Sequence, residues 1–163
     1  MTNTNNLVLV KKLHNDAIIP KRQTELSSGL DLHCLDVVTV NGIKDMYDNG
    51  FTFYELDPGE RVLVRTGLAL QMNPGMEAQI RPRSGLAIKH GITVLNSPAT
   101  LDSDYRSDIG VILVNHSKDI FTITKGDRIA QLVFQPILHY VNLQETSKLT
   151  STGRGEGGYG HTG

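Results

Sequence analysis

The sequence has little of several residue types that direct a chain to particular classes of protein. It contains one cysteine, Cys34, and no tryptophan in 163 residues. One cysteine cannot form an intramolecular disulfide, so the composition does not indicate an oxidising compartment. No apolar run approaches the roughly 18 residues of a membrane-spanning helix, and residues 1–6 are polar and uncharged. We therefore expect a soluble, cytoplasmic protein without a membrane partner.

Charge of one sign is also lacking, because the formal net charge is −1. Duplex-binding proteins usually present a basic face, so no nucleic-acid partner is expected, whereas a small phosphate ligand needs only a few local cations. The six histidines are scattered, without a His-x-x-x-His or a Cys/His cluster, which argues against a zinc site. Cys34 lies beside apolar residues and is expected to be a small buried side chain rather than a nucleophile.

Short apolar, β-branched runs separated by turn residues make up most of the chain. These runs cover residues 7–10, 37–40, 61–70, 76–81, 92–95, 109–115, 120–124 and 129–134. Many short strands predict an all-β domain over residues 1–150, a distorted β-barrel or jelly-roll-like fold. The one helix expected covers residues 84 to about 90, with Ser84 as its N-cap. Residues 41–53 suit an inserted loop, either tolerated or a binding element for an unknown protein partner.

The C-terminal segment, residues 151–163, is rich in glycine, and half of residues 154–163 are glycine. Glycine in such quantity raises the entropy cost of holding one shape, but the segment also has an arginine, an aromatic ring and a hydroxyl. An arginine and a hydroxyl can bind phosphates, and an aromatic ring can stack on a base. We interpret it as a flexible flap that closes over a nucleotide. Its Gly-x-Gly-x-x-Gly pattern is no dinucleotide fingerprint, because no strand and helix flank it.

Two internal segments carry groups suited to chemistry. In residues 81–85, Pro82 favours an extended Arg81, and Ser84 then opens the short helix beside Arg83. The segment is either an anion site or an ordinary capped turn with exposed arginines. In residues 96–106, strand alternation would place Asp102 and Asp104 on one side. Those carboxylates either activate a water or hold a hydrated metal, or are simply solvated.

Taken in order, five segments resemble the motifs of the homotrimeric, all-β dUTP diphosphatases (dUTPases). They are Ser28-Gly29-Leu30-Asp31-Leu32, Pro82-Arg83-Ser84-Gly85, residues 96–106, Gly126-Asp127-Arg128-Ile129-Ala130-Gln131-Leu132 and residues 154–163. The resemblance spans residues 7–163. It implies Mg²⁺-dependent hydrolysis of dUTP to dUMP and pyrophosphate, which limits uracil in DNA and supplies dUMP. It also implies a homotrimer with shared active sites.

The resemblance implies a role for each matching residue. Asp102 would activate the water that attacks the α-phosphorus, and Tyr105 would pack beneath the deoxyribose. Asn96 and the turn through Leu101 would form a β-hairpin whose backbone pairs with uracil. Asp31 would lie near the water shell of a metal held mainly by the triphosphate. The remaining substrate contacts implied are Arg83, Ser84, Gly85, Gln131, Arg154, Tyr159, Gly160, His161 and Thr162, with Tyr159 stacking on uracil.

Some positions depart from the usual family pattern. Ala99 stands where glycine is usual, so its methyl would clash if that backbone needed a positive φ. Ser107-Asp108 replaces a common Gly-Glu, Tyr159 replaces phenylalanine, and His161 replaces a serine. Two other functions stay open. One is dCTP deaminase, which shares the fold, and the other is a nucleotide-dependent regulatory protein that uses the inserted loop.

Overall fold

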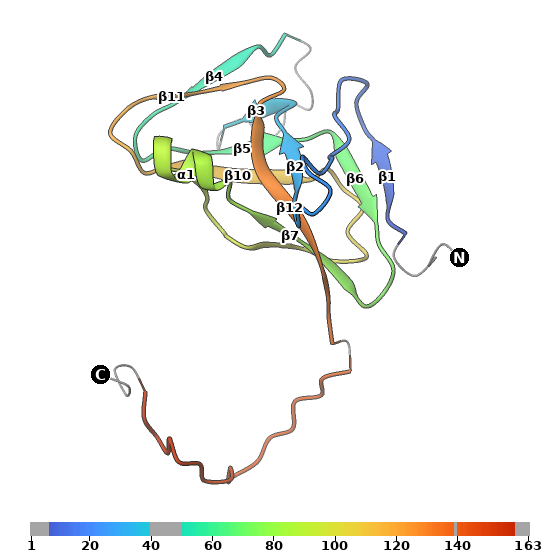
Figure 1. The fold of residues 1–163 in the computed structure, drawn as a ribbon, viewed down its shortest axis with the longest axis vertical. Coiled ribbons are helices and arrows are strands. Elements are labelled where there is room, and N and C mark those ends of the chain that lie inside the picture. The colour runs from blue at the N-terminus through green and yellow to red at the C-terminus, as the bar shows by residue number, and fades with distance from the viewer. Residues whose placement is uncertain (1–6, 40–49, 139, 159–163) are drawn as a thin grey trace.

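Short antiparallel strands form nearly all the regular structure of the chain, for which a computed structural model describes residues 7–39, 50–138 and 140–158. One helix, α1 (Ser84–His90), occurs in this described part (Figure 1). The strands are β1 (Leu9–Lys12), β2 (Leu30–His33), β3 (Asp36–Val38), β4 (Phe53–Leu56), β5 (Arg61–Arg65), β6 (Leu68–Gln71), β7 (Met76–Arg81), β8 (Ile92–Val94), β9 (Ala99–Leu101), β10 (Gly110–Asn115), β11 (Phe121–Thr124) and β12 (Arg128–Pro136). The predicted all-β class with one short helix is confirmed.

Two four-stranded sheets, β3-β5-β10-β8 and β2-β12-β7-β9, form the body of the molecule, and the pairs β1-β6 and β11-β4 flank them. Alternate residues of both sheets are buried and contribute to one hydrophobic cluster. Val64 and Leu113 come from the first sheet, and Leu32 and Ile80 from the second, each at most 1% exposed. The sheets make a distorted jelly-roll-like arrangement, and the described strands do not close into a barrel.

Gly67 interrupts the longest predicted strand, residues 61–70. The backbone there has φ +68°, which L side chains rarely adopt, and a Cβ would lie 2.6 Å from Leu35 Cδ2. The chain therefore bends between β5 and β6, and β6 leaves to pair with β1. Strands β2, β4 and β9, each of three or four residues, were not among the predicted runs.

The helix begins one residue away from the predicted cap. Arg83, not Ser84, is the N-cap, with an extended backbone (φ −91°, ψ 127°) and no side-chain capping hydrogen bond. Pro82 cannot donate a backbone hydrogen bond and keeps the preceding residue extended, so the chain turns into the helix only after Arg83. The helix ends at Gly91, whose left-handed backbone (φ 65°) lets its N–H bond back to Ala87 and Leu86.

Beyond β12 the chain runs away from the body of the molecule in an extended course (Figure 1). Leu138, Tyr140 and Leu143 are between 83% and 96% exposed along it. Residues 159–163 lie outside the described part of the chain, as do residues 40–49 of the predicted inserted loop. No helix in the described ranges is long and apolar enough to cross a bilayer.

Candidate active site

Three neighbouring strands bring charged and amide side chains together at one end of the second sheet. In the register of β12 with β2 and β7, Gln131 lies opposite Asp31 on one side and opposite Arg81 on the other. Since Arg83 follows β7 after Pro82, it reaches the same end of the sheet. Asp31, Arg83, Arg128 and Gln131 are called the charge cluster below.

Asp31 is the centre of the charge cluster. Its Oδ1 lies 3.4 Å from Arg83 Nε and its Oδ2 lies 3.2 Å from Arg128 Nη1. The Asp31 side chain is 9% exposed, whereas those of Arg83 and Arg128 are 25% and 44% exposed. A nearly buried carboxylate needs such partners, because removing an unpaired charge from water is costly. The arginines thus keep most of their donors available on the open side.

Arg128, the first residue of β12, completes this cluster. The structure shows the ion pair with Asp31. Its backbone oxygen also accepts a hydrogen bond of 2.9 Å from Arg83 Nη1. The only sequence signal was its place next to the turn before β12, so reasoning from charge alone could not pair it with Asp31, 97 residues away.

Gln131 is held against the turn that leads to the helix, because its Nε2 donates to the Pro82 carbonyl at 3.3 Å. Gly29 packs beside it, and a Cβ at Gly29 would lie 2.5 Å from Gln131 Oε1. A glycine therefore precedes β2 for reasons of space. Ser84 and Gly85 follow as the first, exposed residues of α1, and nothing lies within 4 Å of the Cβ position of Gly85. The structure brings these predicted phosphate contacts together.

A cleft of about 320 Å³ opens beside Arg83 and Arg128, between α1 and β11. His90 and Phe121 line it, with ring centroids 5.2 Å apart. Arg83, Arg128 and Asp127 give this cleft charged groups of both signs, and Leu86, Ile123 and Ile129 add apolar lining.

His33 is the last residue of β2, the strand that carries Asp31, and Cys34 follows it. Burial lowers the pKa of His33, and its Nδ1 is enclosed without a hydrogen-bond partner in the described residues. Burial raises the pKa of the Cys34 thiol to about 12, with Asp36 and Asp127 adding to the rise. Cys34 is 2% exposed, so the expectation of a small buried side chain is confirmed.

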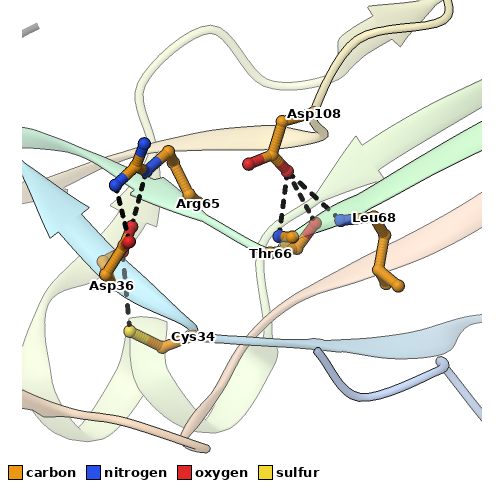
Figure 2. A network of polar contacts seen from close by, with 7 residues as sticks. Cys34, Asp36, Arg65, Thr66, Leu68 and Asp108 are labelled. Carbon is orange, nitrogen blue, oxygen red and sulfur yellow. Dashed lines mark hydrogen bonds and ion pairs between the residues drawn. The ribbon is translucent and has the colours of Figure 1, made fainter. Parts of the chain in front are cut away.

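Asp36 and Arg65 form a second, buried ion pair (Figure 2). Both guanidinium-carboxylate hydrogen bonds are 2.6 Å long, and the side chains are 10% and 4% exposed for Arg65 and Asp36. The bidentate geometry joins β3 to β5, next to the end of β2. We therefore interpret this ion pair as one that stabilises the sheet and not as a ligand contact.

Residues 102–108, called the 102–108 turn below, hold the predicted water-activating carboxylate. The expected strand alternation of Asp102 and Asp104 is wrong, because β9 ends at Leu101 and the chain then turns. Tyr105 N–H donates to the Asp102 carbonyl at 3.1 Å, closing that turn. The Asp102 side chain is exposed and has no hydrogen bond or ion pair within the described ranges. It is therefore open to a water molecule.

The predicted hairpin at residues 96–101 is also wrong as a paired element. β8 pairs with β10 and β9 pairs with β7, so the chain crosses from one sheet to the other in an exposed turn at Asn96. Ala99 lies in extended β9 opposite Ile80 and is 7% exposed. Its methyl group thus fills the core instead of straining a turn. The base-pairing role of Asn96 and Leu101 stays a prediction.

The charge cluster and the 102–108 turn lie at different points along β7. Arg81 is the β7 residue opposite Gln131, whereas Ala78 is the residue opposite Leu101. These positions differ by three residues, about 10 Å at the rise of an extended strand. Asp102 follows Leu101 as the first residue of the turn. Within one copy of the chain, the predicted phosphate contacts of the charge cluster therefore lie apart from the predicted base in the 102–108 turn.

In the tail, Arg154 is exposed, and its Nε donates to the Gly157 carbonyl at 2.9 Å. The predicted contacts Tyr159, Gly160, His161 and Thr162 lie outside the described residues. In the described part of the chain, no group of three or more His, Cys, Asp or Glu side chains could hold a metal ion.

Comparison with known proteins places the chain in a family. The dUTPase family profile matches residues 51–163. The chain is 57% identical to deoxyuridine 5'-triphosphate nucleotidohydrolase of Heliobacterium modesticaldum, over 96% of each chain. It is 50% identical to the protein of that name from Hydrogenobaculum sp., over 96% of this chain and 97% of the other.

Solved structures agree on the fold. The structure of Staphylococcus bacteriophage 80alpha dUTPase with dUpNHpp matches 97% of this chain and 99% of that chain, with a TM-score of 0.76 and 22% identity. The dUTPase of phage phi11 of S. aureus, described with a structural Mg(II) ion, matches 88% and 98% with a TM-score of 0.70 and 20% identity. With the family profile and the bacterial relatives, these matches show that the chain belongs to the dUTPase family.

Proposed function

We propose that this protein hydrolyses dUTP to dUMP and pyrophosphate. The observation that carries the proposal is the 57% identity, over 96% of both chains, to a deoxyuridine 5'-triphosphate nucleotidohydrolase. The exposed Asp102 and the arginines of the charge cluster supply the two kinds of group that this reaction requires. Such a reaction removes a DNA precursor that carries uracil and provides dUMP.

Asp102 acts as the general base in this proposal. Its carboxylate is exposed and free of partners within the described ranges, so it can accept the proton of a water as that water attacks the α-phosphorus. A bond forms between the water oxygen and the α-phosphorus, and the bond from that phosphorus to the bridging oxygen breaks. Pyrophosphate leaves with the electron pair. Because a carboxylate is a weak base for water, its orientation of the nucleophile matters as much as its basicity.

Arg83, Ser84, Gly85 and Gln131 bind the phosphates. Negative charge develops on phosphate oxygens during the reaction, and fixed donors lower its energy without having to reorganise. The ion pairs with Asp31 hold Arg83 and Arg128 at this end of the sheet before any ligand arrives. Tyr105 lies beneath the sugar, where its ring leaves no space for a 2′-hydroxyl. Arg154 and the tail residues after it close over the triphosphate.

The donor set fits a magnesium ion held mainly by the substrate. Mg²⁺ keeps several waters and commonly binds one or two carboxylates together with phosphates, so it needs no protein cage. Asp31 would contact its water shell, which accords with a single nearly buried carboxylate at the cluster. When bound, the ion neutralises charge on the phosphate oxygens.

We also propose that the protein works as a homotrimer whose active sites are completed between subunits. The separation of the charge cluster from the 102–108 turn along β7 supports this arrangement. So does the C-terminal segment, which leaves the body of its own subunit with its apolar side chains exposed (Figure 1). A neighbour's Asp102 would then face the cluster, and a tail would cover both.

The test is pyrophosphate release from dUTP, dTTP, dCTP and UTP in the presence of Mg²⁺, followed by identification of the nucleotide product. Release from dUTP alone, with dUMP as the product, is the expected result. Conversion of dCTP to a uracil nucleotide would instead assign the protein to the deaminase branch of this fold. Binding of dUTP without turnover would favour the regulatory function.

A further inference from the structure

Asp108 accepts hydrogen bonds from a bend that lies far from it in the sequence. Its Oδ1 lies 2.9 Å from the Gly67 nitrogen, 3.3 Å from the Leu68 nitrogen and 3.5 Å from Thr66 Oγ1. Figure 2 shows the carboxylate directed at this bend between β5 and β6. Two backbone N–H groups of the bend thus donate to one carboxylate oxygen.

The bend that receives Asp108 is a fixed part of the core. Thr66 and Leu68 are 1% and 0% exposed. Thr66 Oγ1 donates to the Ile109 carbonyl at 2.9 Å, and Ile109 N–H donates to the Leu68 carbonyl at 2.8 Å. A Cβ at Gly67 would meet Leu35 at 2.6 Å, so the bend has no space to move inward. Asp108 is therefore attached to a rigid support.

The backbone of Asp108 belongs to the 102–108 turn, of which it is the last residue. Tyr105 Oη donates to the backbone oxygen of Asp108 at 2.9 Å, and Tyr105 N–H donates to the Asp102 carbonyl at 3.1 Å. The turn is thus connected to the sheet at Leu101, where β9 pairs with β7, and at Asp108. Arg106 adds a longer contact, because its Nη1 lies 3.4 Å from the Leu70 carbonyl of β6 and 2.6 Å from the Ser103 carbonyl within the turn. Between these points Asp102 and Tyr105 are exposed and bury little surface that would hold them.

We propose that Asp108 is a positioning residue that fixes the 102–108 turn to the β5–β6 bend, so that Asp102 and Tyr105 keep the geometry for reaction. The inference rests on the proposed function for its effect on rate. Its effect on the order of the turn does not depend on that function. The carboxylate contacts neither water nor nucleotide in this role and acts through the backbone of the turn.

The test compares Asp108→Ala and Asp108→Asn with the wild type in the full chain. Misplacement of a catalytic group by about 1 Å can cost about 100-fold, so we expect Asp108→Ala to lower kcat for dUTP by about 10- to 100-fold with a smaller change in KM. Asp108→Asn keeps an acceptor oxygen for the bend and should recover most of the rate. Amide hydrogen exchange of residues 103–107 should accelerate in Asp108→Ala and stay close to wild type in Asp108→Asn.

Asp119→Ala is the matched control. Asp119 is an exposed aspartate between β10 and β11, and only its backbone takes part in the hydrogen bonds found in the described ranges. It should retain wild-type kcat and exchange. If Asp108→Ala does not fold, Asp108→Ser replaces it, because the shorter hydroxyl side chain does not reach the bend, and kcat should fall in a folded protein.

Two results would overturn the proposal. One is a folded Asp108→Ala protein, or a folded Asp108→Ser protein in its place, with wild-type kcat, which would show that Asp108 contributes to stability and not to the rate. The other is unchanged exchange of residues 103–107 in the same variant, which would show that the turn is held by other contacts. If the wild type fails to hydrolyse dUTP, the proposed function is wrong, and the exchange measurement alone decides the anchoring role.

Discussion

The charge cluster and the 102–108 turn differ in how the fold holds them. The cluster lies on three paired strands, and Asp31, Arg83 and Arg128 restrain one another through ion pairs. The turn is mostly exposed, is attached at its two ends and to β6 through Arg106, and leaves the Asp102 carboxylate without a partner within the described ranges. Groups that stabilise charge work best when they are fixed in advance, whereas a base must stay available to a proton. The two regions satisfy these different requirements.

This difference has an energetic consequence. A substitution in the cluster removes interactions that hold the sheet together, so it should reduce both stability and activity. A substitution of Asp102, the exposed carboxylate proposed as the base, should reduce activity alone. Measuring both quantities for each variant tests whether the two regions are as distinct as their contacts indicate.

The largest effect is expected for Asp102→Asn, which should lower kcat by about 10²- to 10⁴-fold through loss of the general base. Since Asp102 is exposed, its free energy of unfolding should change by no more than about 0.5 kcal/mol. Steady-state kinetics and urea unfolding measure the two quantities. Asp104→Asn is the matched control, and a loss of rate as large as that of Asp102→Asn would move the base to Asp104.

Asp31→Ala should damage both properties, because it leaves the Arg83 and Arg128 guanidinium groups facing each other. We expect a loss of about 1–3 kcal/mol in the free energy of unfolding, less than for a fully buried pair because Arg128 is 44% exposed. Turnover should fall as well. The comparison variant is Asp16→Ala, whose 2.6 Å ion pair with Lys125 is exposed. If Asp31→Ala and Asp16→Ala lower the free energy of unfolding equally, the Asp31 ion pairs contribute no more to stability than an exposed pair.

Gly85→Ala should change stability and substrate binding in opposite directions. Nothing lies within 4 Å of the added methyl group, and alanine favours a helix over glycine, so stability should rise by up to about 1 kcal/mol. If a phosphate approaches the backbone here, the methyl group should raise KM for dUTP about tenfold or more. Thermal unfolding and initial rates are the measurements. An unchanged KM would remove Gly85 from the phosphate site.

The smallest effect concerns the exposed ion pair between Asp16 and Lys125, and it depends on pH. The hydrogen bond and charge of Lys125 lower the pKa of Asp16 below its ordinary value of 3.8. Because the folded-state pKa is the lower one, the contribution is present above about pH 4 and disappears as the pH falls through the folded-state pKa. Asp16→Asn should therefore be slightly less stable than the wild type near neutral pH only. A difference that persists in acid would point to a cause other than this charge.

The sequence predicted the regular parts of the fold well, because they depend on local pattern. The run at residues 76–81 has the same bounds as β7, and the helix covers residues 84–90 as expected. The break at Gly67 was missed, since a β-branched run gives no sign that the core leaves no space for a side chain there.

In the candidate site, sequence motifs and periodicity predicted less than they did for the fold. The motifs located Asp31, Arg83 and Gln131, which the strand register then brings to one end of the sheet. Arg128 could not be paired with Asp31 without that register. The alternation expected after Leu101 failed because Asp102 begins a turn, which Tyr105 closes by a hydrogen bond that no periodicity predicts. The hairpin failed because β8 and β9 join different sheets.

The most direct test of the central claim mixes two inactive variants, Asp102→Asn and Arg83→Ala, after separate purification and subunit exchange. If each site takes its charge cluster from one subunit and its 102–108 turn from another, random exchange should restore about a quarter of the sites. Pyrophosphate release from dUTP should then reappear in the mixture. If exchange is demonstrated and activity stays absent, both groups belong to one subunit and the account of a shared site is wrong.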